Sequence, residues 1–383
     1  MYPDWPKFSS DLVPLPLCEG PKLEPFDFQG PQKIDFLQHI GEGSHSHVFK
    51  VEILGQVYAL KLASNLQNTT TFKFVGDEDW ESPVGKGNKD NLEALTAFSN
   101  YAEPFNCECR AFGRLKEADC EHLATKCFGY LLLEEDNERV MMDQFKDLAL
   151  DFTEHYPEFD LRSRFLGKDG RPPPIRGIIK ELGQPNENLR TGTLRGILGD
   201  VKQIQQLGII RLDIAHRQII SGKLSDFSTT ITFPHFMTNP ELNPHITPEV
   251  MARMELQTFK MSLCDYCMFD DMVQEWNYYH RDPKDQLAFY SLPGGKSGRG
   301  LEYELRSLPS RQRVYTLADP RQYNWKRSDG RVTKNRRRPR AKPTRWYYKD
   351  DPDEVAKMKR RQLYGAAYEW HYKDGHAFPH ESF

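Results

Sequence analysis

Residues 207–228 read LGIIRLDIAHRQIISGKLSDFS, and this stretch decides the fold. Ile219-Ile220 before Ser221-Gly222 and Leu224 after it predict a tight hairpin, with Asp213 before it and Asp226 after it. In phosphoryl transfer, one such aspartate accepts or orients the proton of the attacking hydroxyl. An amide side chain and a second aspartate hold the Mg²⁺ that bridges the phosphates. We therefore predict Asp213 as a catalytic residue, and Gln218 and Asp226 as metal ligands.

A stretch with two glycines lies earlier in the chain, at residues 41–48, where a strand is expected to begin. It fits the pattern G-x-G-x-x-(small)-x-V, in which glycines allow backbone N–H groups to approach phosphate oxygens closely. Two glycines in a hairpin more often form only a turn. We also expect His45 and His47 to be loop side chains rather than ligands. The candidate cofactor-binding residues here are Gly41, Gly43, Ser46 and Val48.

Two runs typical of strands, residues 47–53 and 56–62, are joined by Leu54-Gly55, which suits a short hairpin. The second run ends in Tyr58-Ala59-Leu60-Lys61. It is similar to the V-A-I-K pattern, whose lysine pairs with phosphates and with a glutamate on a helix. The natural partner lies in a helix that Pro104 opens, although a solvated surface pair is the alternative. Lys61 is thus a candidate for both catalysis and cofactor binding, and the other candidates for cofactor binding are Glu108, Lys180 and Glu181.

The order of these motifs resembles that of the protein kinases. The segments 15–21, 105–110 and 226–228 further resemble the Fta-two subunit family of the fungal Sim-four kinetochore complex, whose members carry a divergent protein-kinase-like domain. This resemblance covers roughly residues 12–290. It implies a location in the nucleus, at the kinetochore, with inner-kinetochore subunits as partners and a role in kinetochore assembly and chromosome segregation.

The predicted fold class is α+β, with a two-lobed protein-kinase-like fold and a basic C-terminal extension. Strand-like runs dominate before residue 183, and an amphipathic helix is predicted from Leu194 to Leu207, which agrees with a sheet-rich half followed by a helical half. The expected divisions are a Pro-rich arm at 1–31, an N-lobe at 32–183 with insertions at 64–100 and 135–170, a C-lobe at 184–290, and the extension at 291–383.

Several positions depart from the kinase pattern. Arg211 stands where kinases have a histidine that supports the catalytic loop. Gln218 replaces an asparagine with a side chain one methylene longer, which misplaces a ligand for the near-octahedral Mg²⁺. Ser46 and Ser228 replace glycines, and the nearest match to A-P-E is Thr247-Pro248-Glu249. ATP and Mg²⁺ are candidate cofactors. We expect a pseudokinase scaffold, and the alternative is an active Ser/Thr-type protein kinase.

Composition excludes several classes of protein. The 383 residues contain no run near the roughly 18 apolar residues that span a bilayer, and the start resembles no secretion signal. Seven unevenly spaced cysteines form no disulfide framework, so we expect a reduced, intracellular, soluble protein. Cys107-x-Cys109 and Cys264-x-x-Cys267 are expected to be buried or idle thiols, and no structural metal is expected. Asp265 either anchors the catalytic loop, as a helix aspartate does in kinases, or lies on an ordinary helix surface.

Positive charge is concentrated near the C-terminal end. Residues 299–345 hold 15 basic and 4 acidic residues, which leaves the rest of the chain at a net charge of −14. Such runs serve as nuclear-import signals or contact the phosphate backbone of nucleic acids, and the alternative is a solvated tail. Trp346-Tyr347-Tyr348 and a predicted helix at 352–368 follow the run. The candidate residues for nuclear import or contact with DNA or chromatin are Lys334, Arg336, Arg337, Arg338 and Arg340.

Overall fold

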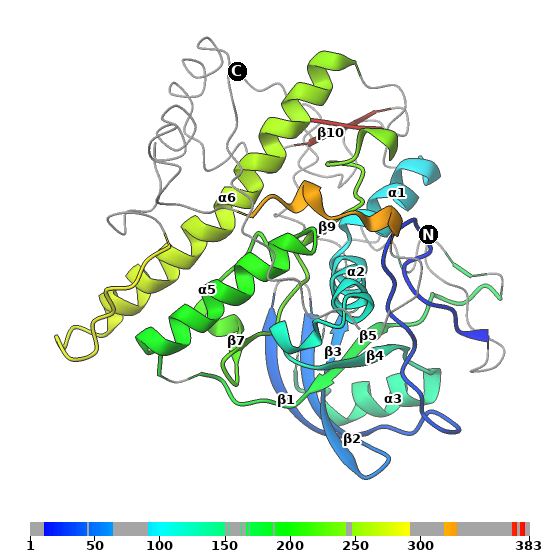
Figure 1. The fold of residues 1–383 in the computed structure, drawn as a ribbon. Coiled ribbons are helices and arrows are strands. Elements are labelled where there is room, and N and C mark those ends of the chain that lie inside the picture. The colour runs from blue at the N-terminus through cyan, green and yellow to red at the C-terminus, as the bar shows by residue number, and fades with distance from the viewer. Residues whose placement is uncertain are drawn as a thin grey trace, which may run out of the picture.

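The computed structural model describes residues 11–43, 46–63, 91–148, 150, 152, 162, 166–167, 169–186, 188–242, 247–291, 318–327, 370–373 and 376–379. Within these ranges the chain combines α-helices with a five-stranded antiparallel sheet, which confirms the predicted α+β class (Figure 1). The helices are α1 (Leu92–Ala102), α2 (Pro104–Glu117), α3 (Glu135–Gln144), α5 (Thr191–Gln206) and α6 (Pro248–Tyr279), with short 3₁₀ turns at Glu121–Leu123, His216–Gln218, Pro240–Leu242, Pro320–Gln322 and Trp325–Arg327.

The sheet has the strand order β1-β2-β3-β5-β4. Its strands are β1 (Asp35–Gly43), β2 (Ser46–Ile53), β3 (Gln56–Ala63), β4 (Cys127–Leu132) and β5 (Arg176–Glu181). The two strands predicted on either side of residues 54–55 are confirmed. The turn between them places Leu54 and Gly55 at φ 53° and 73°, a left-handed pair that matches the twist of a two-residue hairpin. Strand β1 was not predicted, because most of its side chains are exposed or half-buried and its pattern is therefore polar.

The two faces of the sheet contact different surroundings. One face carries an apolar core in which Phe49 and Leu60 pack with Met141 of α3 and with Phe152. The opposite face carries Val48, Lys61 and Lys180, and it faces α2 and the segment that follows α5. The first face is apolar and is covered by α3, whereas the second carries lysines that form ion pairs with a residue of α2.

Helix α2 joins the sheet to the helical part of the molecule. Its first turn is capped by Glu103, whose carboxylate accepts a hydrogen bond from the Asn106 backbone N–H at 3.2 Å, and Pro104 occupies its start. Two arginines on α2 are fully buried: the guanidinium of Arg110 donates to the carbonyl of Thr232 at 3.0 Å, and that of Arg114 donates to the carbonyl of Phe233 at 2.7 Å. These bonds hold α2 against the short strand that ends at Thr232.

Helices α5 and α6 form the helical part, and α2 lies beside α5 above the sheet (Figure 1). The apolar stripe predicted for residues 194–207 is confirmed, because Leu194, Ile197, Val201 and Ile204 of α5 are all buried in one core with α2 and α6. Four two-residue strands support the loops between α5 and α6: β6 (Ile209–Ile210) pairs with β9 (Ile231–Thr232), and β7 (Ile219–Ile220) pairs with β8 (Lys223–Leu224). The second pair is the predicted hairpin around Ser221-Gly222.

The described part of the N-terminal arm packs on both parts of the molecule. Leu15 and Leu23 bridge to each other and are buried in the core that also contains α2 and α5. Gly113 of α2 lies directly under the arm, so that a Cβ at this position would stand 2.4 Å from the Lys22 carbonyl oxygen. Because only glycine allows so close an approach, the arm is an integral part of the fold.

The segments predicted as insertions contain regular structure where they are described. Helix α1 occupies residues 92–102, and α3 at residues 135–144 buries Met141 against the sheet. The remainder of the first segment, residues 64–90, lies outside the described residues. So do Lys334, Arg336, Arg337, Arg338, Arg340, the aromatic trio at 346–348 and the helix predicted at 352–368. A hairpin of β10 (Trp370–Lys373) and β11 (His376–Pro379) follows.

The cysteines are as expected from their spacing. None of the seven, all of which fall in described ranges, forms a disulfide, and Cys107, Cys109 and Cys267 are buried. Burial raises the pKa of Cys107 and of Cys109, so both thiols stay protonated at neutral pH. Among the described helices, none combines the length and the hydropathy that crossing a bilayer requires.

Candidate functional site

Three elements bring charged side chains together between the sheet and α2. The ammonium group of Lys61 on β3 lies 2.9 Å from Glu108 Oε2 on α2 and 2.7 Å from Asp226 Oδ1, which follows β8. The Lys61 and Glu108 side chains are 11% and 2% exposed. This pair is therefore a buried ion pair, and the alternative of a solvated surface pair is wrong.

A second lysine enters the same site from the neighbouring strand. Residues 59 and 61 of β3 pair with residues 180 and 178 of β5, so Lys61 and Lys180 project from the same face of the sheet. The Lys180 ammonium group donates to Glu108 Oε1 and, at 2.8 Å, to the carbonyl oxygen of Ser225. Glu108 is thus held between two lysines. Lys61, Glu108, Lys180 and Asp226 are called the Lys61 cluster below.

The charges in the Lys61 cluster stabilise one another. Burial alone would lower the pKa of Lys61, but the carboxylates of Asp226 and Glu108 outweigh it and raise that pKa above its usual value. Burial likewise would raise the pKa of Asp226, but Lys61, Lys180 and a hydrogen bond from the Ser228 N–H hold it well below its usual range. Both groups are therefore charged across the whole physiological range of pH.

The loop at residues 211–218 lies next to this cluster and is called the Asp213 loop. The Asp213 carboxylate accepts hydrogen bonds from Gln218 Nε2 and, at 3.0 Å, from Arg217 Nη2. The other end of the Gln218 amide, Oε1, accepts from Arg211 Nη2 at 3.1 Å. Both ends of this amide are engaged, so a metal ion could take Oε1 only by displacing the arginine.

Arg211 replaces the histidine of the kinase pattern and points into the interior. Its side chain is 1% exposed, and its guanidinium lies over the Phe227 ring at 4.5 Å. Burial lowers the pKa of Arg211, and the nearby carboxylates of Asp226, Asp265 and Asp213 partly offset that effect. Its Nε and Nη1 have no hydrogen-bond partner among the described atoms. The arginine therefore contributes one more buried positive charge to the site.

Asp265 of α6 holds the start of this loop. Its carboxylate accepts hydrogen bonds from the backbone N–H groups of Arg211 at 3.0 Å and Leu212 at 2.8 Å, and from Gln205 Nε2 at 2.9 Å. Leu212 has φ 62°, a left-handed conformation that is costly for a leucine and needs such support. Asp265 is fully buried, and burial raises its pKa to about 6 despite these bonds. The anchoring role is thus confirmed, and the alternative of an ordinary helix surface is wrong.

The two glycines predicted to approach phosphate lie at the end of β1. A Cβ added at Gly41 or at Gly43 would meet no described atom within 4 Å, and neither glycine has a left-handed φ. Neither packing nor backbone geometry therefore requires glycine here. Ser46 and Val48 follow on β2, and Val48 pairs with Lys61 in the neighbouring strand. This stretch borders the face of the sheet that carries the Lys61 cluster.

The sequence predicted most of the residues that the structure brings together. Lys61, Glu108, Lys180 and Asp226 form one cluster, and Asp213 and Gln218 lie in the adjoining loop. Glu181 is the exception, because it is exposed at the end of β5, where alternation turns it away from Lys180. Arg211 was missed as a member of the site. The only available signal was its position in an apolar run, where a charged residue needs buried partners.

The fold and the site define an α+β protein with an antiparallel sheet, a capping helix α2 and a buried cluster of paired charges between the sheet and the loops after α5. The chain matches the family described as kinetochore Sim4 complex subunit FTA2 over residues 12–231, more than half of its length. It therefore belongs to this family, as the sequence predicted. No curated protein matches the chain. Membership places the chain at the kinetochore, hence in the nucleus, with other subunits of that complex as partners.

Proposed function

We propose that the chain is a kinase-like subunit of its kinetochore complex that binds ATP but transfers phosphate poorly or not at all. One observation carries the proposal: Lys61 on β3 pairs with Glu108 on the helix behind the sheet and with Asp226 beyond the hairpin. Protein kinases need this same set, a strand lysine paired with a helix glutamate and an aspartate that holds Mg²⁺. The antiparallel sheet followed by a helical part supports the two-lobed arrangement.

Binding of the phosphates follows from the charges. Lys61 and Lys180 offer two ammonium groups on one face of the sheet, and Gly41 and Gly43 leave the backbone at the rim unobstructed. The Lys61 ammonium group donates a hydrogen bond to Asp226. An incoming triphosphate would compete with that carboxylate for the same ammonium group, which is how a site balanced in charge can exchange one anion for another.

Poor transfer follows from the Asp213 loop. A base must be able to reach the acceptor hydroxyl, but the Asp213 carboxylate already takes hydrogen bonds from Arg217 and Gln218. Mg²⁺ needs uncompensated oxygen ligands, whereas Lys180 and Arg211 already supply positive charge beside Asp226. The two extra cations do part of the work of the metal ion, and we infer that ATP binds with little dependence on Mg²⁺.

In the kinetochore such a domain acts as a scaffold. A fold stabilised by buried ion pairs can present fixed surfaces to neighbouring subunits whether or not it performs chemistry. The basic run with Lys334, Arg336, Arg337, Arg338 and Arg340 is proposed to serve nuclear import or contact with DNA or chromatin. Deleting residues 326–345 should therefore reduce nuclear accumulation or weaken the salt-sensitive retention of the chain on DNA. Unchanged behaviour in both assays would remove this role.

The test of the proposal has two steps. First, the thermal midpoint of the full chain is measured with and without ATP. Binding to the folded state raises it, and ATP at about 100 times its Kd adds roughly 2.7 kcal/mol to the free energy of unfolding. Second, transfer of labelled phosphate is followed for the wild type and for Asp213→Asn. We expect stabilisation by ATP and no transfer. No stabilisation would contradict the nucleotide site, and transfer that disappears in Asp213→Asn would establish an active kinase instead.

A further inference from the structure

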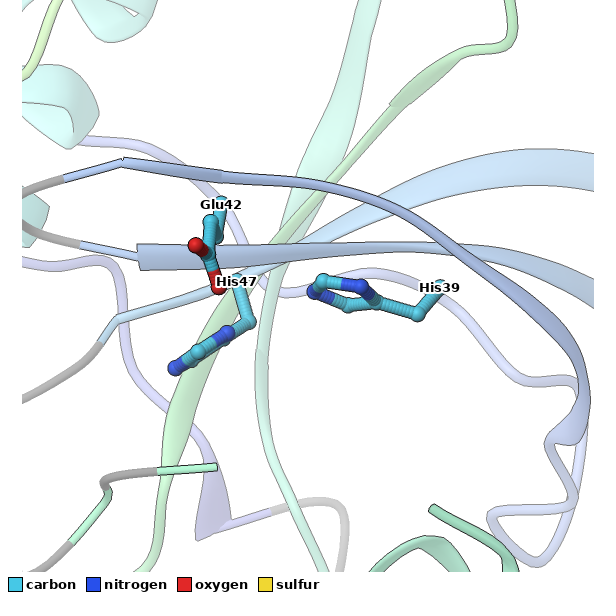
Figure 2. Close-up of side chains that lie close together, drawn as sticks. All are labelled: His39, Glu42 and His47. Carbon is cyan, nitrogen blue, oxygen red and sulfur yellow. The ribbon is translucent and has the colours of Figure 1, made fainter. Parts of the chain in front are cut away.

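A second cluster lies on the opposite face of the sheet from Lys61. It consists of His39 and Glu42 on β1 and His47 on β2 (Figure 2). One imidazole nitrogen from each histidine and one carboxylate oxygen lie within 4.8 Å of one another. Figure 2 shows the Glu42 carboxylate and the His39 ring directed toward His47 from the same side of the two strands. Two imidazoles and a carboxylate at this spacing are a known type of donor set for a metal ion.

A β-bulge brings these three residues to one face. In a regular strand, residues 39 and 42 would point to opposite faces, because side chains alternate with a period of two. The register of β1 against β2 shifts between His39 and Gly41, so His39 lies opposite Phe49 while Glu42 lies opposite His47. Residues 47 and 49 lie on the same face of the sheet. Their partners on β1, Glu42 and His39, therefore lie on that face as well. Bulges re-aim side chains in this way and often lie beside functional sites.

The surroundings hold the two rings in place. His39 packs edge-on against Phe49, with ring centroids 5.2 Å apart, and His47 lies 5.2 Å from the Phe152 ring. His47 is buried, whereas Glu42 is exposed at the rim and leaves a path for entry. The Nε2 atom of His39 is buried and has no hydrogen-bond partner among the described atoms. A buried nitrogen that lacks a partner is costly unless something occupies it, and a metal ion does so directly.

We propose that His39, Glu42 and His47 bind one divalent transition-metal ion of the zinc class. Imidazole nitrogen favours zinc, nickel, copper or iron, whereas Mg²⁺ and Ca²⁺ prefer oxygen ligands only. Ligands about 2.1 Å from a tetrahedral zinc ion stand roughly 3.4 Å apart, so the present spacing of up to 4.8 Å must close by at most about 1.4 Å. The exposed Glu42 side chain can make that movement. Three protein ligands leave the fourth position for water or for an incoming group.

The ion would join the ends of β1 and β2, and two of its ligands lie within residues 41–48. It lies on the face away from the Lys61 cluster, so the site does not depend on the proposed nucleotide site. No structural metal was expected from the sequence. The spacing His39-x-x-Glu42 places both residues on one face only if the strand is bulged, and a bulge is not readable from the side chains. His45, between these strands, lies outside the described residues.

The test is a calorimetric titration of zinc chloride into the reduced, EDTA-treated and dialysed full chain. We expect one strong site in the wild type, and an affinity at least about tenfold weaker in Glu42→Gln and in His39→Gln. The matched controls are Glu52→Gln on β2 and the exposed His122→Gln, which should bind zinc like the wild type. A parallel titration with magnesium chloride should show no binding at this site.

Two outcomes would overturn the proposal. One is a wild type that binds no zinc stoichiometrically. The other is a Glu42→Gln variant that binds zinc as tightly as the wild type, which would place the ion elsewhere, for example on cysteine thiols. Glu42 is exposed, so this variant tests the ligand without disturbing the core even if His39→Gln fails to fold. The proposed ligands would also appear in X-ray absorption of the zinc complex as nitrogen and oxygen neighbours without sulfur.

Discussion

The Lys61 cluster and the Asp213 loop lie side by side, but they differ in how closely their bonding matches the kinase pattern. In the cluster, Lys61 pairs with the carboxylates of both Glu108 and Asp226. In the loop, Asp213 and Gln218 bind each other, and Arg211 takes the remaining amide oxygen. The comparison shows that residues can be present in the right order while their bonding partners prevent the expected role. Binding and transfer are separate properties, and the proposed function assigns this chain the first and not the second.

The difference comes from the balance of charge. Two carboxylates of the cluster, Glu108 and Asp226, face two lysines, and Arg211 adds a third cation from the loop. These five groups carry a net charge of +1, so the site has little to gain from Mg²⁺, whose binding depends on negative charge that has no other partner. The predictions below test this contrast between the cluster and the loop.

The largest effect is expected from Lys61→Met. The substitution removes the main cation of the half-buried Asp226 and one of the two cations of the buried Glu108, and removing one partner of a buried ion pair costs about 3–5 kcal/mol. Denaturant unfolding should show this loss, and ATP should no longer stabilise the variant. Lys50→Met on the neighbouring strand β2 is the control and should lose little stability. Equal stability of the two variants would mean that the cluster contributes nothing to the fold.

An intermediate effect is expected from Asp265→Asn, because Asp265 holds the Asp213 loop and not the Lys61 cluster. The variant loses one of the two acceptors for the Arg211 and Leu212 N–H groups, at a cost of about 1–3 kcal/mol for an unsatisfied buried donor. The control is Asp143→Asn on the exposed side of α3. A loss no greater than that of the control would show that the loop holds its own conformation.

The same aspartate gives the stability a dependence on pH. Burial raises the pKa of Asp265 to about 6 from an ordinary value of 3.8, so the folded chain keeps this proton at a pH where the unfolded chain has lost it. The contribution of Asp265 to stability is therefore greatest below pH ~4 and declines as the pH rises to about 6. In Asp265→Asn this decline should be absent. A decline of the same size in both proteins would assign it to other groups.

The smallest effect is expected from the double substitution Arg211→His with Gln218→Asn, which brings the loop back to the kinase pattern. Removing the buried cation and releasing the amide should make ATP binding depend more on Mg²⁺, by about tenfold, or 1.4 kcal/mol. Arg217→Gln is the control, because that side chain is 71% exposed and its bond to Asp213 is a surface ion pair of little energy. No gain in Mg²⁺ dependence would mean that Arg211 does not substitute for the metal ion.

The sequence was sufficient to predict the parts of the site that follow from local patterns. Lys61 could be predicted because residues 58–61 are similar to the V-A-I-K pattern, and Glu108 because helical spacing places it on one face with Phe112 and Leu115. The hairpin at Ser221-Gly222 could be predicted because a glycine between two strand-like segments favours a turn, and the structure gives both residues a positive φ. Asp265 was named with two alternatives, because nothing local shows which side of a helix will be covered.

Other features depend on contacts between distant segments and could not be predicted. The burial of Arg211 rests on Phe227 and on carboxylates from α6 and from beyond the hairpin. Strand β1 has a polar pattern because one side of it is exposed, and its bulge appears only in its register with β2. The packing of the arm on Gly113 likewise joins residues about 90 positions apart, a separation that no local pattern reveals.

The most direct test of the central claim, that Lys180 and Arg211 supply charge that Mg²⁺ would otherwise supply, is the affinity of the full chain for ATP with and without the metal ion. Calorimetric titration of ATP would be carried out once with excess Mg²⁺ and once with EDTA. The charge balance of the site predicts two dissociation constants within about threefold of each other, a difference under roughly 0.7 kcal/mol. A loss of about a hundredfold or more in EDTA, or no binding under either condition, would contradict it.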